Sequence, residues 1–170
     1  MWFIFVLGGI CLFTLALGGY SLAPWLPIFK RDLPRVFTLA NLKPGERFYD
    51  LGSGDGRLVR YAAKKYGSRA TGIEIALPLY VWSSAVQLLQ RIPGVSYRFE
   101  SLFSTPLHDA AVVYVFGRPG KLGKKITDKL TAELRPGARV ISYTFPLEGK
   151  EPVVVDKPTD KDLSMYLYNF

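Results

Sequence analysis

The segment from Phe48 to Val59 constrains the fold of this chain more than any other stretch. It reads FYDLGSGDGRLV, an apolar run that leads into a turn with glycine at every second position and then into a helical pattern. Glycines at this spacing allow backbone conformations that other residues avoid, and they let the backbone approach a ligand closely. The segment predicts a strand, a ligand-binding turn and a helix in direct succession.

The rest of the chain alternates between short apolar runs and helical patterns. The expected strands are 47–51, 70–75, 95–99, 111–116 and 138–143. The expected helices are 31–40, 55–66, 77–90 and 121–134. Two later apolar runs, 153–155 and 165–168, have no helix between them and are expected to pair antiparallel at one edge. This alternation predicts an α/β fold, a doubly wound, mostly parallel sheet with helices on both faces.

The glycine turn does not match the common phosphate-binding patterns. Arg57 stands where a dinucleotide fingerprint needs its third glycine, and no Gly-Lys-Ser/Thr follows as a phosphate loop requires. Asp50 precedes the turn, and a carboxylate there would repel a pyrophosphate but suits a ligand that carries an ammonium and a sulfonium. Glu74 ends the second strand 18 residues after Gly56, where such folds place an acid that binds both ribose hydroxyls. The ligand with these features is S-adenosyl-L-methionine.

Through Asp50–Arg57 the sequence resembles the class I S-adenosylmethionine-dependent methyltransferases, which have a Rossmann-like fold. Further likeness lies in PWLP at 24–27, VFGRP at 115–119 and ELRPGARVIS at 133–142. These segments are similar to those of the membrane-anchored protein-lysine methyltransferases that modify the ATP synthase c-subunit and the adenine nucleotide translocase, and of their small archaeal relatives. The resemblance extends from residue 24 to about 146. It implies methylation of lysine side chains.

The resemblance also implies which residues hold the cofactor. Those expected to bind it are Asp50, Gly52, Ser53, Gly54, Gly56, Glu74 and Ser101. Relatives often carry Asn or Asp after the third strand, where it can meet the adenine amino group. Here Glu100 and Ser101 stand at that place, so Ser101 is the weaker partner expected for the adenine.

Methyl transfer to an amine needs alignment more than a dedicated base. The amine must be neutral and held about 3 Å from the methyl group, away from water. Apolar aromatic walls would lower the pKa of an entering lysine, and the candidates for such a channel are Trp25, Phe116 and Tyr143. No catalytic residue is assigned, although His108 is a conceivable base in a short loop before the fourth strand. With one His and one Cys, the chain offers no Cys/His metal cluster, and no metal is expected.

The first 29 residues carry no charged side chain. Within them, residues 2–22 form an apolar run of about the 20 residues that a membrane-spanning helix needs. A cleaved signal peptide is the main alternative, but no basic residue precedes the run. Lys30, Arg31 and Arg35 follow it, so the positive-inside rule places the domain on the cytoplasmic side, or the matrix side if the protein is mitochondrial. The sequence therefore predicts a single-pass membrane protein.

The expected organisation is an anchor over 1–23, a connector and pre-methyltransferase segment over 24–45, and a methyltransferase domain over 46–170. The net charge is +8, and basic residues cluster over 57–69 and 118–139. Given the anchor, anionic lipid headgroups explain this excess better than nucleic acid. The leading hypothesis is a membrane-anchored methyltransferase for lysines of a membrane protein. The alternatives are a methyltransferase for a lipid or quinone-like small molecule, and a non-catalytic cofactor-binding module.

Overall fold

The computed structural model describes residues 2, 5, 8, 9, 27–116 and 120–170. The predicted anchor, except for those first four residues, and the predicted channel residue Trp25 lie outside the described residues. So does Arg118, the first residue of the second basic segment. Within the part of the chain that the structure describes, no helix has the length and apolar character needed to cross a membrane.

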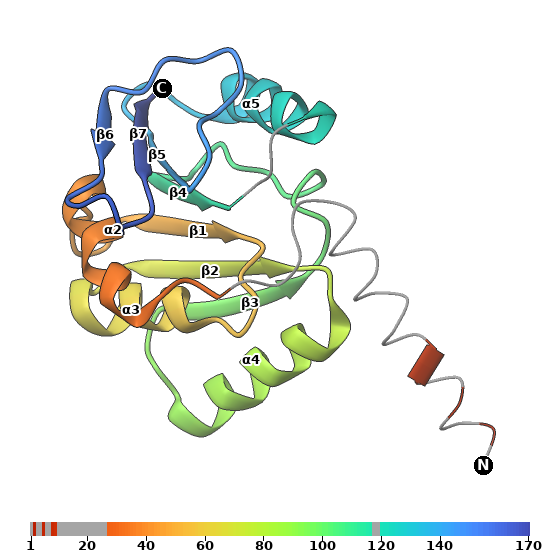
Figure 1. The fold of residues 1–170 in the computed structure, drawn as a ribbon. Helices are drawn as coiled ribbons and strands as arrows, with labels where there is room; N and C mark the ends of the chain where they lie inside the picture. Colours follow the sequence, from red (N-terminus) through yellow and green to blue (C-terminus); the bar gives the residue numbers. More distant parts are fainter. Residues whose placement is uncertain (1, 3–4, 6–7, 10–26, 117–119) are drawn as a thin grey trace.

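The centre of the domain is a mostly parallel sheet (Figure 1). In chain order its strands are β1 (Arg47–Leu51), β2 (Arg69–Glu74), β3 (Val95–Phe99), β4 (Val112–Val115), β5 (Arg139–Tyr143), β6 (Val154–Asp156) and β7 (Met165–Asn169). Across the sheet the order is β3-β2-β1-β4-β5-β7-β6. The pairs among β1 to β5 are parallel, whereas β7 runs antiparallel to both β5 and β6. The prediction of a parallel sheet with an antiparallel edge is confirmed.

The strand order reverses between β1 and β4, which are hydrogen-bonded neighbours. In open α/β sheets, ligands bind outside the carboxyl ends of the strands at such a switch point. Asp50 lies near this end of β1, in register with Gly72 of β2 and Tyr114 of β4. Glu74 is the last residue of β2. The topology therefore brings both predicted acids to the same edge of the sheet.

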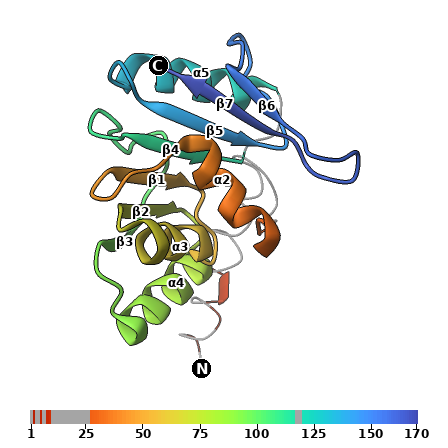
Figure 2. The ribbon, with the colours of Figure 1, turned by 90° about the vertical axis from the view of Figure 1, so that its left-hand side faces the viewer.

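Helices cover both faces of the sheet, as a doubly wound fold requires (Figure 2). They are the short 3-10 helix η1 (Lys30–Asp32), α2 (Leu33–Ala40), α3 (Arg57–Tyr66), α4 (Leu77–Gln90) and α5 (Lys121–Glu133). One apolar core cluster joins α2 and α3 to the sheet. A second cluster joins α5 to the opposite face. Helix α4 packs on β3 and β2 on the side of α3, where the rings of Tyr80 and Phe99 meet at a tilt of 39° with centroids 5.5 Å apart.

Two helices begin differently from the sequence expectation, each for a local reason. The expected helix 31–40 divides into η1 and α2, and its proline lies in the first turn of α2, where no backbone N–H is needed. The expected helix 55–66 begins at Arg57, because Gly56 before it has a left-handed backbone. Val36 and Phe37 of α2 are fully buried in the core cluster that joins α2 to the sheet.

Candidate functional site

The turn after β1 needs its glycines for conformational reasons. Gly52, Gly54 and Gly56 have φ angles of +98°, +54° and +74°, in the left-handed region that favours glycine. The backbone N–H groups of Gly52 and Ser53 both donate to the carbonyl of Ile73, at 2.9 Å each. These bonds fix the turn against β2. The alternating glycines in the sequence are therefore a requirement of the turn itself.

Gly56 has a second role, which is to leave room for Tyr97 of β3. A Cβ atom on Gly56 would lie 2.2 Å from the Tyr97 hydroxyl oxygen. That hydroxyl donates to the carbonyl of Gly56 at 3.0 Å and accepts from Arg60 Nη1 at 3.2 Å. Burial, the largest influence, raises the pKa of Tyr97 to about 12, so the hydroxyl stays protonated at neutral pH. The Tyr97 side chain therefore packs against the glycine turn and stabilises it.

The sequence interpretation did not include Tyr97. Gly72 is the sequence feature that could have indicated this contact, because a glycine inside a strand often marks a close approach by another group. A Cβ atom on Gly72 would lie 2.7 Å from both the Ser53 hydroxyl oxygen and the Tyr97 ring. Two side chains thus fill the space above this glycine, and both belong to the site.

Asp50 is the most unusual group of the site. Its side chain is 3% exposed, and its Oδ1 atom has no hydrogen-bond partner in the described part of the chain. Burial raises the pKa of Asp50 well above its ordinary value, and the charges of Glu74 and Asp55 raise it further. Buried polar atoms are nearly always hydrogen-bonded. An unpartnered carboxyl group at the carboxyl edge of the sheet fits a ligand that brings a positive charge.

Glu74 connects the turn to the start of α4. Its Oε2 atom accepts the N–H of Gly54 at 2.7 Å, and its Oε1 atom accepts the N–H of Ala76 at 2.8 Å. Burial raises the pKa of Glu74, although these hydrogen bonds oppose the shift. Each carboxylate oxygen can accept a further hydrogen bond. The arrangement is compatible with the predicted contact to a ribose diol.

Ser101 lies after β3, at the same edge of the sheet, and is half-buried. Its hydroxyl oxygen accepts the N–H of Phe103 at 3.2 Å, and its carbonyl accepts the hydroxyls of Ser104 and Thr105 at 2.9 and 3.1 Å. Ser101 thus stabilises the turn that follows β3. Its contact with an adenine stays a prediction.

An aromatic cluster stands at the carboxyl ends of β4 and β5. The ring of Phe116 meets that of Tyr143 edge-on at 5.8 Å and stacks near Phe145 at 6.3 Å. Tyr143 is buried, and its hydroxyl donates to Asp32 Oδ2 at 2.7 Å. The structure therefore brings Phe116 and Tyr143 together. Phe116 is half-buried, whereas Tyr143 is buried.

His108 lies at the opposite edge of the sheet. It is exposed and precedes the amino end of β4. Its neighbour Asp109 forms an ion pair with Arg47, the first residue of β1. This position removes His108 as a base for chemistry beside Asp50. Within the described ranges, no three His, Cys, Asp or Glu side chains are grouped to hold a metal ion.

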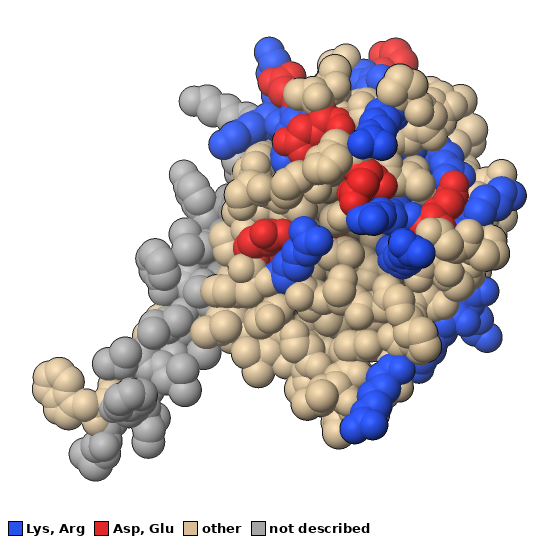
Figure 3. All heavy atoms as spheres, turned by 180° about the vertical axis from the view of Figure 1, so that it is seen from behind, with Lys and Arg blue, Asp and Glu red and all other residues tan. Residues whose placement is uncertain are grey.

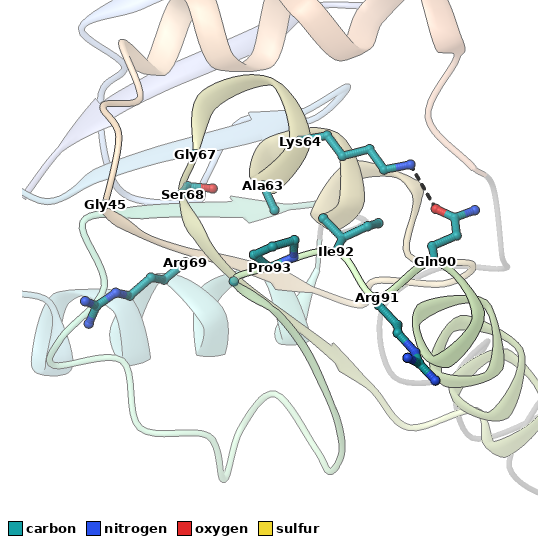
Figure 4. A pocket seen from close by; sticks show the side chains of 11 residues that line it. Gly45, Ala63, Lys64, Gly67, Ser68, Arg69, Gln90, Arg91, Ile92 and Pro93 are labelled. Carbon is teal, nitrogen blue, oxygen red and sulfur yellow. Dashed lines mark hydrogen bonds between the residues drawn. The ribbon is translucent and has the colours of Figure 1, made fainter.

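A hollow of about 530 Å³ also lies at the amino edge, between α3, the start of β2 and the end of α4 (Figure 4). Lys64, Arg69 and Arg91 stand at its rim. Because Arg69 begins β2 whereas Glu74 ends it, this hollow is not the site of Asp50 and Glu74.

The fold and the site together define a Rossmann-like, S-adenosylmethionine-dependent methyltransferase. The crystal structure of an RNA methyltransferase from Salinibacter ruber, in complex with S-adenosyl-L-homocysteine, superposes with a TM-score of 0.78. It is 30% identical in sequence, and the match covers 85% of this chain and 93% of that chain. The family model described as the ANTKMT methyltransferase domain matches residues 50–154. The chain belongs to this family, and the predicted cofactor, S-adenosyl-L-methionine, is confirmed.

Three relatives of known sequence agree with the resemblance seen in the chain. The adenine nucleotide translocase lysine N-methyltransferase of Mus musculus is 37% identical over 146 residues, which are 81% of this chain and 60% of that protein. A protein-lysine N-methyltransferase of Saccharolobus islandicus is 30% identical over 152 residues, 85% of this chain and 92% of that protein. The lysine N-methyltransferase for the ATP synthase c-subunit of Rattus norvegicus is 34% identical over 125 residues, 72% of this chain and 56% of that protein. The chain thus spans little more than half of the two animal relatives.

Proposed function

We propose that this chain is a membrane-anchored enzyme that transfers methyl groups from S-adenosylmethionine to lysine side chains of a membrane protein. The relatives above are named as lysine methyltransferases, and two are named for substrates that are membrane proteins. The uncharged stretch of 29 residues supports the anchor, with the domain on the cytoplasmic or matrix side. The observation that carries the cofactor part of the proposal is the buried Asp50 Oδ1 atom beside the glycine turn, which has no hydrogen-bond partner among the described residues.

The residues of the turn can hold the cofactor in distinct ways. When bound, S-adenosylmethionine supplies a methyl group on a positively charged sulfur. Asp50 offers a carboxylate to its cationic part, Glu74 offers acceptors to the ribose hydroxyls, and Ser101 is the candidate for the adenine. Gly52, Gly54 and Gly56, together with Ser53, allow the backbone to come close to the ligand.

The aromatic cluster is suited to receive a lysine. An apolar wall next to a positive charge lowers the pKa of an entering ammonium group, so that a neutral amine becomes available. Burial, and then the hydrogen bond to Asp32, raise the pKa of Tyr143, so its hydroxyl stays protonated and does not act as a base. Phe116 therefore forms the wall nearest to the substrate, with Tyr143 supporting it and Trp25 as a further wall.

A second candidate substrate is RNA. It is favoured by the likeness to the Salinibacter ruber RNA methyltransferase. Lipid or quinone methylation and cofactor binding without catalysis are the other possibilities that the sequence leaves open.

One experiment separates these functions. Membranes from cells that express the wild type or Asp50→Asn are incubated with cofactor labelled in its methyl group, and protein, lipid and RNA are then separated. We expect label in protein that hydrolyses to methyl-lysine, and its loss in Asp50→Asn. Asp109→Asn, an acid at the opposite edge, is the matched control and should keep the activity. Label only in lipid or only in RNA would replace the lysine proposal, and alkaline carbonate washing of the same membranes tests the anchor.

A further inference from the structure

Helix α4 exposes an apolar stripe to solvent. None of its 14 residues is charged, and in the described structure Ser83 is its one buried side chain. Four of its large apolar residues are exposed: Val81 by 54%, Trp82 by 60%, Leu88 by 73% and Leu89 by 83%. With Ala85 these residues follow helical spacing along the side that faces away from the sheet. We call these five residues the α4 stripe.

Basic residues border the α4 stripe at the carboxyl end of the helix. Residues 57–99 contain a single acid, Glu74, and it is buried. Three of the seven basic residues of this range are not part of this border: Arg57 pairs with Asp55, Arg98 pairs with Glu100, and Arg69 alternates with the core residue Ala70 and so points to the opposite face of the sheet. Lys64 and Arg91 lie at the carboxyl end of α4. The rear of the molecule differs, because acidic and basic side chains lie side by side there (Figure 3). An apolar stripe with a cationic border complements an anionic lipid surface.

The rim of the hollow at the end of α4 adds to this border. In Figure 4, Lys64 reaches across to Gln90, and its Nζ atom donates to Oε1 at 3.0 Å. The side chain of Arg91 extends outward at the end of α4, whereas that of Arg69 extends to the other side of the hollow, away from α4. Positive charges therefore stand directly beyond Leu88 and Leu89, where headgroups would lie if the α4 stripe contacted acyl chains.

The path of the chain places the same region near a bilayer. Ile28 is buried, and its carbonyl accepts a hydrogen bond from Arg57 Nη1 at 3.3 Å, at the start of α3. Ile28 lies six positions after Leu22, the end of the apolar run, and this segment reaches at most about 20 Å. Both α3 and α4 begin at the carboxyl edge of the sheet, after β1 and β2. An anchor that ends at Leu22 would thus hold this edge close to the lipid.

We propose that α4 lies in the surface of an anionic bilayer, with the α4 stripe in the boundary between headgroups and acyl chains. Lys64 and Arg91 then contact the headgroups. This inference rests on the proposed function for the anchor alone, since the exposure and the charges are independent of it. It fixes the orientation of the domain, because a helix lying flat on the bilayer sets the cofactor edge beside the membrane surface. A lysine in a short loop of a membrane protein is then in reach.

The full chain provides its own reporter of this contact. It has three tryptophans, so Trp2→Phe with Trp25→Phe leaves Trp82 as the single one. This variant is reconstituted into phosphatidylcholine–phosphatidylglycerol vesicles whose acyl chains carry bromine, which quenches nearby tryptophan. We expect Trp82 to be quenched, and we expect Leu88→Ser with Leu89→Ser to lower the quenching at least tenfold relative to the same tryptophan in unmodified α4.

A matched control places the reporter elsewhere. In the same background, Trp82→Phe with Val153→Trp moves the tryptophan next to β6, to a site that is also 60% exposed. This tryptophan should stay unquenched. Equal quenching at both positions, or an unquenched Trp82 in anchored protein, would overturn the inference.

Flotation of the vesicles after alkaline carbonate treatment reports on the anchor separately. Retained protein with unquenched Trp82 leaves the anchor in place and removes the role of α4. Quenched Trp82 in protein that carbonate releases supports α4 and removes the anchor. In the variant with Trp82 as its single tryptophan, Lys64→Gln and Arg91→Gln should each weaken the docking of α4 on the vesicles, measured by the quenching of Trp82, by roughly fivefold.

Discussion

Two buried aspartates of this domain have opposite surroundings. Asp32 is 1% exposed, and both of its oxygens are bonded, one to Arg35 Nη1 at 2.8 Å and the other to the Tyr143 hydroxyl at 2.7 Å. Asp50 is 3% exposed, yet its Oδ1 atom has no partner among the described residues. The two aspartates are thus equally buried, but of the two only Asp32 has hydrogen-bond partners for both carboxylate oxygens.

The difference separates a structural acid from a functional one. Arg35 also donates a hydrogen bond to Asp156 of β6 at 2.6 Å. The hydrogen bonds around Asp32 therefore join the start of the domain to the edge of its sheet. Asp50 stands instead at the switch point of the sheet, where burial and the charge of Glu74 raise its pKa. A carboxyl group in such surroundings is stabilised by a cationic ligand. Substitutions at these acids and at their neighbours should therefore differ in the size of their effects.

The largest effect is expected from Asp32→Ala. The change removes the buried partner of the Tyr143 hydroxyl and leaves Arg35 paired with Asp156 alone. Removing one member of a buried ion pair typically costs about 3–5 kcal/mol of folding free energy. Urea unfolding of the cofactor-free protein measures this loss. A loss below about 1 kcal/mol would mean that the network does not hold the domain together.

Gly56→Ala should destabilise the protein by about 2 kcal/mol or more. The backbone at this position is left-handed, which alanine disfavours, and the new Cβ atom would collide with the Tyr97 hydroxyl. Tyr97→Ala removes the collision, so the double variant should lose clearly less stability than the sum of the two single losses. Additive losses in a double-mutant cycle would contradict the packing described for this turn.

Asp50→Asn should stabilise the cofactor-free protein by about 1 kcal/mol at neutral pH, or roughly 3 °C in Tm. Because the pKa of Asp50 is raised on folding, the folded state binds its proton more tightly than the unfolded state. Stability of the wild type therefore falls as pH rises from the ordinary value of 3.8 through the raised pKa. Thermal unfolding measured as a function of pH checks this. Below pH 3.8, the wild type and Asp50→Asn should be equally stable. A wild type that becomes more stable than the Asn variant as pH rises would refute the assignment.

The smallest effect is expected from Arg47→Ala, at the amino edge. Its ion pair with Asp109 is half exposed, and such pairs contribute less than about 1 kcal/mol. The same urea titration measures it. A loss as large as that of Asp32→Ala would mean that the half-exposed pair of Arg47 and Asp109 contributes as much to folding as the buried network of Asp32.

Sequence patterns sufficed where a residue's role is local. The glycines of the turn are visible because left-handed backbone restricts the choice of residue, and the strands are visible because their apolar runs are short and regular. Asp50 and Glu74 follow from these, since they lie at the carboxyl ends of predicted strands. The sequence could place these acids but could not show that both are buried.

Other features depend on contacts between distant parts of the chain. Tyr143 was predicted as a channel wall, and its bond to Asp32 joins residues 111 positions apart. Tyr97 reaches the turn through the register of β1, β2 and β3, which no local pattern contains. The helix α4 was predicted, but its exposed side becomes evident only once α3 and β3 are in place.

Calorimetry with S-adenosylmethionine tests the central claim most directly. Asp50→Asn should bind about ten- to a hundredfold more weakly than the wild type, the effect of losing a charged hydrogen-bond partner worth about 1.5–3 kcal/mol. Arg47→Ala should bind as the wild type does. Unchanged affinity in Asp50→Asn would contradict the proposed role of Asp50, because the unpartnered carboxylate would then contribute nothing to holding the cofactor.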